Sequence, residues 1–148
     1  VEIDTSELNI YQLRRRILTA LGISAAGVSL LFESFAFKRG VPSEADFVFD
    51  ARALPNPHWE PRLRPLSGRD GAVADYFEAR PEVGEFIDDV ERFLKRWLPR
   101  FDPSERSYLT VAVGCTGGRH RSVYIAERLQ ERFRALGGEV LCFHRELA

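Results

Sequence analysis

Apolar and polar residues along the chain follow two alternating patterns. Short runs of β-forming apolar residues predict strands at residues 28–37, 47–49, 109–113 and 140–143. Apolar residues spaced three and four positions apart predict helices, one between Ser6 and Gly22 and others at 72–79, 82–101 and 119–136. We expect the apolar face of the 82–101 helix, including Phe93 and Trp97, to point into the core. The alternation of strands and helices predicts one α/β domain with a small, mostly parallel sheet flanked by helices.

Residues 54–71 follow neither pattern. Proline occurs at positions 55, 57, 61 and 65, which predicts a stiffened loop, and we expect Trp59 and Leu66 to be its apolar anchors. This loop also carries basic side chains that could close over a bound anion: His58, Arg62, Arg64 and Arg69.

Composition narrows the classes of protein that fit. The 148 residues are 45% hydrophobic and 29% charged, as in a single globular domain. A net charge of −1 means that any nucleic-acid contact has to come from a local basic face. Two cysteines fit reduced thiols in a cytoplasmic protein, and no stretch resembles a membrane helix or a signal peptide. The chain starts at Val1 and contains no methionine, so we expect a piece of a longer protein.

The segment 107–129 predicts an anion-binding loop between a strand and a helix. Glycines at 114, 117 and 118 let the backbone turn and leave amide N–H groups uncovered at a helix N-terminus, where anions are favoured. Arg119, His120 and Arg121 add donors beside these amides, and the spacing of Arg121 makes it the strongest single candidate. The alternative is a tight strand-to-helix connection that binds no ligand.

An enzymatic interpretation of the same loop is the weaker one. Cys115 and Arg121 have the C-x5-R spacing of cysteine-dependent phosphatases, and Ser122 follows. Such an enzyme also needs a general acid, and Asp102, which precedes the strand, is expected at the opposite end of the sheet. Gly114 stands where phosphatases usually have histidine. We therefore predict no catalytic residues and no enzyme, and keep the phosphatase as the alternative.

Several long motifs occur in the same order as in one known family. They include Gly114-Cys-Thr-Gly-Gly-Arg-His-Arg-Ser-Val-Tyr-Ile-Ala-Glu127, Asp46-Phe-Val-Phe-Asp-Ala-Arg-Ala-Leu-Pro-Asn-Pro-His-Trp59, and Ser34-Phe-Ala-Phe-Lys38. The whole chain, residues 1–148, resembles the C-terminal domain of the RapZ family of bacterial RNase adapter proteins. That family places a P-loop domain before this region. No Gly-x4-Gly-Lys-[Ser/Thr] occurs here, so ATP or GTP would bind only through the absent domain, and we expect no cofactor or metal in this chain.

The resemblance implies a regulatory domain that senses glucosamine-6-phosphate and binds small regulatory RNA. It also implies that the protein has an endoribonuclease and signalling proteins as partners. It further implies that the protein forms a homo-oligomer and does not contact membranes. The matching ligand-binding positions are His58, Thr116, Gly117 and Arg121, with Arg64 and Ser107 as neighbours; the anion loop adds Cys115, Gly118, Arg119 and His120. The RNA-binding candidates are Lys38, Arg39, Arg119, His144 and Arg145. The family typically adds a basic C-terminal tail, whereas this chain ends at Ala148, so we expect weaker RNA affinity than the family's.

Overall fold

A four-stranded parallel sheet forms the centre of the molecule. The computed structural model describes residues 29–101, 108–136 and 139–147, so the helix expected before Gly22 lies outside the described residues. The strands are β1 (Ser29–Ala36), β2 (Phe47–Asp50), β3 (Tyr108–Cys115) and β4 (Val140–His144), in the spatial order β2-β3-β1-β4. Each pair of neighbouring strands is parallel, which confirms the predicted α/β class.

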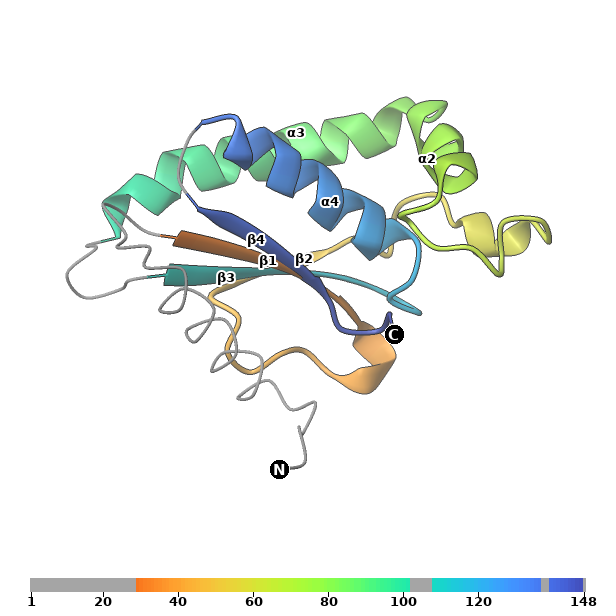
Figure 1. The fold of residues 1–148 in the computed structure, drawn as a ribbon, viewed down its shortest axis with the longest axis horizontal. Helices are drawn as coiled ribbons and strands as arrows, with labels where there is room; N and C mark the ends of the chain where they lie inside the picture. Colours follow the sequence, from red (N-terminus) through yellow and green to blue (C-terminus); the bar gives the residue numbers. More distant parts are fainter. Residues whose placement is uncertain (1–28, 102–107, 137–138, 148) are drawn as a thin grey trace.

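Helices cover one face of this sheet (Figure 1). They are α2 (Gly71–Glu78), α3 (Pro81–Trp97) and α4 (Arg121–Arg134), and three short 3₁₀ helices, η1 (Phe37–Arg39), η2 (Pro57–Trp59) and η3 (Leu98–Arg100), lie in the connections. The α-helix predicted to reach residue 101 stops at Trp97. Leu98 still has helical dihedral angles, but Pro99 has no amide hydrogen to continue the α-helical hydrogen bonds, and the chain goes on as η3. Among the described residues, no helix is both long enough and apolar enough to cross a lipid bilayer.

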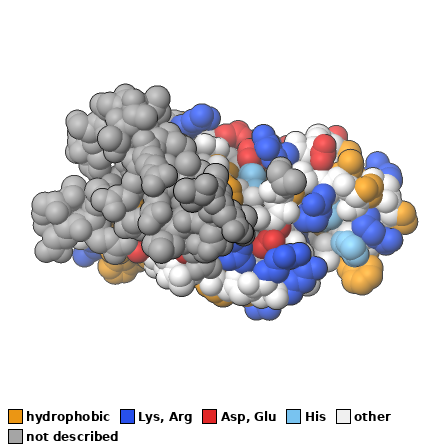
Figure 2. Space-filling model, turned by 60° about the horizontal axis from the view of Figure 1, so that its bottom comes forward, with side chains coloured by type: hydrophobic (Ala, Val, Ile, Leu, Met, Phe, Trp, Pro, Cys, Tyr) orange, Lys and Arg blue, Asp and Glu red, His pale blue; other side chains and the backbone are white. Residues whose placement is uncertain are grey.

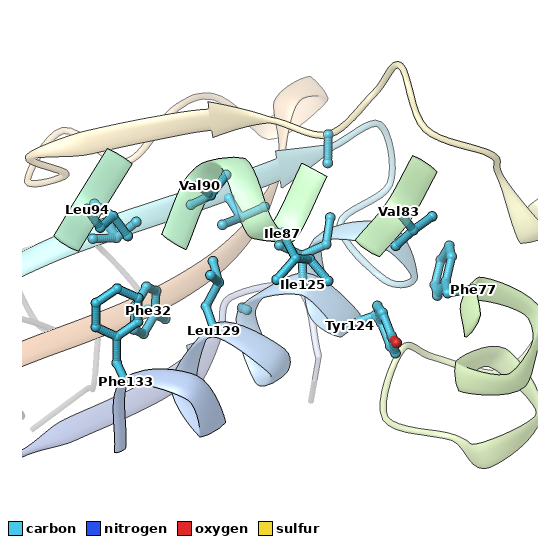
Figure 3. Close-up of a cluster of buried hydrophobic side chains, with 14 of the residues drawn as sticks. Phe32, Phe77, Val83, Ile87, Val90, Leu94, Tyr124, Ile125, Leu129 and Phe133 are labelled. Atoms are coloured by element: carbon cyan, nitrogen blue, oxygen red, sulfur yellow. The ribbon is translucent and has the colours of Figure 1, made fainter. Parts of the chain in front are cut away.

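The core lies between the sheet and helices α3 and α4 (Figure 3). Every residue of β3 is buried, as expected for a strand flanked by two others. Helix α3 buries a stripe at helical spacing: Val83, Ile87, Val90 and Leu94. The expectation that Phe93 and Trp97 are also core residues is wrong, since they are 41% and 37% exposed. Phe93 instead covers β2, where its ring meets Phe47 and Phe49 edge-on.

Strand register brings three connections to the same edge of the sheet. Ala36 of β1 pairs with Cys115 of β3, and Asp50 of β2 pairs with Gly114 of β3. The segments that follow β1, β2 and β3 therefore leave the sheet side by side. In an open parallel sheet this carboxyl edge is where ligands bind.

Candidate functional site

The β3–α4 connection turns at one glycine. Gly118 has a φ of +70°, and a Cβ there would lie 2.8 Å from the backbone nitrogen of Ala36. Only glycine fits such a position without strain. The other two glycines act differently from the prediction. Gly114 lies within β3, where a Cβ would collide with the rings of Phe35 and Phe37, and Gly117 faces open space. The loop therefore turns at Gly118 and leaves room for a ligand at Gly117.

A cavity of about 450 Å³ opens beside this loop. That volume falls within the range of small-molecule sites. Its lining combines the β3–α4 loop, the proline-rich loop and η1: Lys38, Asn56, His58, Trp59, Arg64, Cys115, Thr116, Gly117, Arg119, His120 and Arg121. Eight of the predicted ligand-binding residues thus meet at one cavity. Gly118 does not line it, and Ser107 lies outside the described residues.

Arg121 is held inside the protein. Only 4% of the residue is exposed, and Nη1 donates to the carbonyl oxygens of Arg52 (2.8 Å) and Leu54 (3.1 Å). Nη2 lies 3.4 Å from the hydroxyl oxygen of Thr116. The guanidinium therefore ties the segment after β2 to the anion loop. A ligand in the cavity could reach Arg121 through Nη2, while Nη1 is occupied by the two carbonyls.

The proline-rich loop packs tightly against the start of α4. The Gly68 amide donates to the carbonyl of Arg119 at 2.8 Å, and a Cβ on Gly68 would lie 2.5 Å from the carbonyl oxygen of His120. The buried ring of His120 places Nε2 3.1 Å from the Leu63 carbonyl oxygen. Burial lowers the pKa of His120 below its usual value. His120 therefore acts chiefly as a wall of the cavity that fastens the loop.

His58 and Trp59 form the outer rim of the cavity. Arg64 Nε donates to the carbonyl oxygen of His58 at 2.8 Å, which fixes the backbone at this residue. The two rings meet edge-on with their centres 5.7 Å apart. The expectation that Trp59 anchors the loop is wrong, because it is 76% exposed; Leu63, at 1% exposure, is the buried anchor.

The cavity is electropositive. Lys38, Arg64 and Arg119 line it and are exposed, whereas no aspartate or glutamate occurs among the described residues that line it. The negative charge of the nearby Asp50 is balanced by Arg52, whose hydrogen bonds hold the pKa of that carboxyl below its usual value. Such a surface attracts anions with several acceptor oxygens, phosphates above all.

Cys115 is buried at the end of β3. Its thiol lies 3.2 Å from the hydroxyl oxygen of Ser122, and the Ser122 amide donates to the sulfur at 3.4 Å. These contacts join the strand to the first turn of α4.

The predicted RNA-binding residues lie in two environments. Lys38 is exposed at the cavity, and Arg39 is 69% exposed although it pairs with Glu146. Arg145 instead donates to the Gly40 carbonyl oxygen and stacks over Phe35. Figure 2 shows lysine and arginine side chains beside histidine side chains on the part of this face that is free of grey atoms, with a smaller number of acidic side chains between them. A basic surface thus surrounds the cavity.

His144 points away from this surface. Its side chain is 8% exposed; Nδ1 lies 2.7 Å from the hydroxyl oxygen of Ser34, and Nε2 lies 2.5 Å from a carboxylate oxygen of Glu127. An RNA contact through this ring would require both bonds to break.

Sequence reasoning missed Asn56 and Trp59 as cavity residues and assigned Lys38 to RNA alone. Their positions in the sequence could have revealed them. Lys38 and Asn56 come after the carboxyl ends of β1 and β2, and Trp59 is next to His58.

Comparison with known proteins identifies the family. The family model described as the RapZ C-terminal domain matches residues 28–148. The chain is 60% identical over 146 residues to a nucleotide-binding protein of Stenotrophomonas maltophilia strain K279a, covering 97% of this chain and 50% of that protein. A nucleotide-binding protein of Xanthomonas campestris pv. campestris strain B100 is 60% identical over 147 residues, with 97% and 52% coverage. The chain thus spans about half the length of these curated relatives. It belongs to the family of RapZ C-terminal domains.

Proposed function

We propose that the cavity binds glucosamine-6-phosphate and that the basic surface around it binds small regulatory RNA. The observation that carries the proposal is the cavity at the carboxyl edge of the sheet, lined by exposed cations and by the loop that starts α4. Phosphate oxygens would accept from Arg119 and from the amides near Gly117, since the helix N-terminus carries a partial positive charge. The sugar would lie toward the rim, where Asn56, His58 and Thr116 offer groups for its hydroxyls and amine.

Isothermal titration calorimetry tests the ligand. Glucosamine-6-phosphate, glucose-6-phosphate, glucosamine and inorganic phosphate are titrated into the same protein, together with ATP and GTP because the relatives carry the name nucleotide-binding protein. We expect glucosamine-6-phosphate to bind more tightly than any other compound. Equal binding of glucose-6-phosphate would remove the amino sugar from the proposal, and equal binding of inorganic phosphate would leave only a general anion site.

Matched arginine variants locate the site. Arg119→Gln removes one charge-assisted bond to phosphate, which corresponds to a loss of affinity of roughly 10-fold or more. Arg134→Gln is the control, because Arg134 is also exposed but lies at the last residue of α4 and does not line the cavity. A similar loss in both variants would place the binding elsewhere.

RNA and sugar phosphate share part of this surface. Lys38, Arg64 and Arg119 are exposed and also line the cavity, so a bound phosphate would neutralise cations that RNA needs. We expect saturating glucosamine-6-phosphate to weaken RNA binding, measured by fluorescence anisotropy of a labelled RNA hairpin at fixed salt. RNA affinity that stays unchanged would exclude this coupling. In this proposal the regulated RNA is then presented to an endoribonuclease by the longer, oligomeric protein.

One contact favours the phosphatase as a second candidate. The Cys115 thiol bonds to the Ser122 hydroxyl, and a hydroxyl in this place could stabilise a thiolate. Against it, Cys115 is buried and Arg121 Nη1 is occupied by two backbone carbonyls. Hydrolysis of p-nitrophenyl phosphate that disappears in Cys115→Ser would establish the enzyme; no hydrolysis by the wild type would exclude it for this substrate.

A further inference from the structure

A second cluster of reactive side chains lies between α4 and β4. Cys142 and His144 are two positions apart on β4, so their side chains leave the strand on the same side. Glu127 projects toward them from α4, which packs against this strand. The ring nitrogen Nε2 of His144, the sulfur of Cys142 and a carboxylate oxygen of Glu127 all lie within 4.8 Å of one another.

From this arrangement we propose that Glu127, Cys142 and His144 bind a zinc-class divalent cation. A sulfur, an imidazole nitrogen and a carboxylate oxygen are all zinc ligands, whereas magnesium and calcium prefer oxygen alone. Three protein ligands leave the fourth tetrahedral position to water or to another small ligand.

The distances suit a tetrahedral ion. With zinc–sulfur bonds of about 2.3 Å and zinc–nitrogen or zinc–oxygen bonds of about 2.0–2.1 Å, neighbouring ligand atoms lie roughly 3.4–3.6 Å apart. The sulfur of Cys142 lies 3.6 Å from His144 Nε2 and 4.0 Å from the Glu127 oxygen. Only the 2.5 Å contact between Nε2 and that oxygen has to open, because the ion would replace the proton between them. The Glu127 side chain is 31% exposed and has room to move.

An outer contact already orients the histidine. Nδ1 of His144 lies 2.7 Å from the hydroxyl oxygen of Ser34, which is fully buried in β1. Ring nitrogens opposite a metal are commonly held in this way, with Nδ1–H donating so that the Nε2 lone pair faces the ion. Arg69, 3.9 Å from Glu127 and 65% exposed, is a further charged group at the cluster. It can turn to solvent when the carboxylate binds a cation.

Cobalt(II) is the probe that reports on the ligands directly. Metal-free protein is titrated with cobalt chloride and followed by absorption spectroscopy. We expect a thiolate-to-cobalt charge-transfer band in the near ultraviolet and the visible bands of four-coordinate cobalt(II), both removed by added zinc, which binds more tightly. Absence of the charge-transfer band would overturn the proposal.

Paired variants test the ligand set. Cys142→Ser should abolish the charge-transfer band, while Cys115→Ser, which changes the only other cysteine, should keep it. Glu127→Gln should weaken zinc binding at least 10-fold in competition with a chromophoric chelator, and Glu131→Gln, one turn further along α4, should not. Ser34→Ala should weaken it roughly 10–100-fold through the lost orientation of His144. A band that persists in Cys142→Ser would overturn the assignment.

A measurement on the wild-type protein tests the metal site without relying on the folding of any variant. Circular dichroism of each metal-free variant first establishes that it is folded. Independently, iodoacetamide alkylation of wild-type Cys142 is followed by mass spectrometry with and without zinc. Slower alkylation of Cys142 in the presence of zinc supports the site, and equal alkylation of Cys142 in both conditions would overturn it.

Discussion

Replacing Arg121 with alanine would test whether this side chain chiefly holds the protein together. Its Nη1 donates to the carbonyl oxygens of Arg52 and Leu54 at 2.8 and 3.1 Å. A hydrogen bond from a charged donor contributes about 1.5–3 kcal/mol, and water can partly replace the donor at these part-buried carbonyls. We therefore expect Arg121→Ala to lower the free energy of unfolding by about 3 kcal/mol, near the lower end for two such bonds.

The matched substitution is Arg119→Ala, two residues earlier in the same loop. The Arg119 side chain is exposed, and the Gly68 amide bonds to its backbone carbonyl, which survives the substitution. Its free energy of unfolding should stay within about 0.5 kcal/mol of the wild-type value. Both variants should nevertheless bind glucosamine-6-phosphate more weakly, because both residues line the cavity.

Urea unfolding followed by far-ultraviolet circular dichroism distinguishes the two variants. The denaturant dependence of the free energy should be the same in both, which establishes that the comparison concerns stability alone. Equal free energies of unfolding for Arg121→Ala and Arg119→Ala would refute the role of Arg121 as the side chain that holds residues 52–54 to the loop.

Other positions give further expected outcomes. Gly118→Ala should destabilise the fold by at least about 1–2 kcal/mol through its positive φ, whereas Gly117→Ala, with open space at its Cβ, should change the unfolding free energy by less than about 0.5 kcal/mol; chemical denaturation compares them. Burial lowers the pKa of His120, so below about pH 6.5 this histidine binds a proton in the unfolded chain but not in the native protein. The free energy of unfolding should therefore fall as the pH drops from about 6.5 toward the lowered pKa, and His120→Gln should reduce this pH dependence. Trp59→Ala should leave the melting temperature unchanged because the side chain is 76% exposed, and should abolish any fluorescence change of this rim tryptophan on ligand binding; a clear loss of stability would contradict the exposed position.

Local patterns were enough to locate the elements and the principal loop. The apolar run at 109–113 and the apolar spacing after residue 119 arise from burial on one strand and on one helix face, which each segment carries in its own residues. The parallel arrangement also followed, because strands that alternate with helices are connected by crossovers. Eight of the ten residues predicted to bind the ligand line the cavity, since they end β3, follow it or lie in the proline-rich loop.

The direction in which Arg121, His144 and Lys38 point was decided by contacts between distant segments. Arg121 turns inward because the carbonyl oxygens of residues 52 and 54, 69 and 67 positions earlier, meet its guanidinium. His144 is buried between Ser34 and Glu127, and Lys38 reaches the cavity because β1 lies beside β3. Trp59 is exposed while Leu63 is buried, although hydrophobicity alone favours burying both. The sequence by itself thus determined which segments form strands, helices and the anion loop. The partners of Arg121 and His144 depend on strand order and register, which long-range packing alone sets.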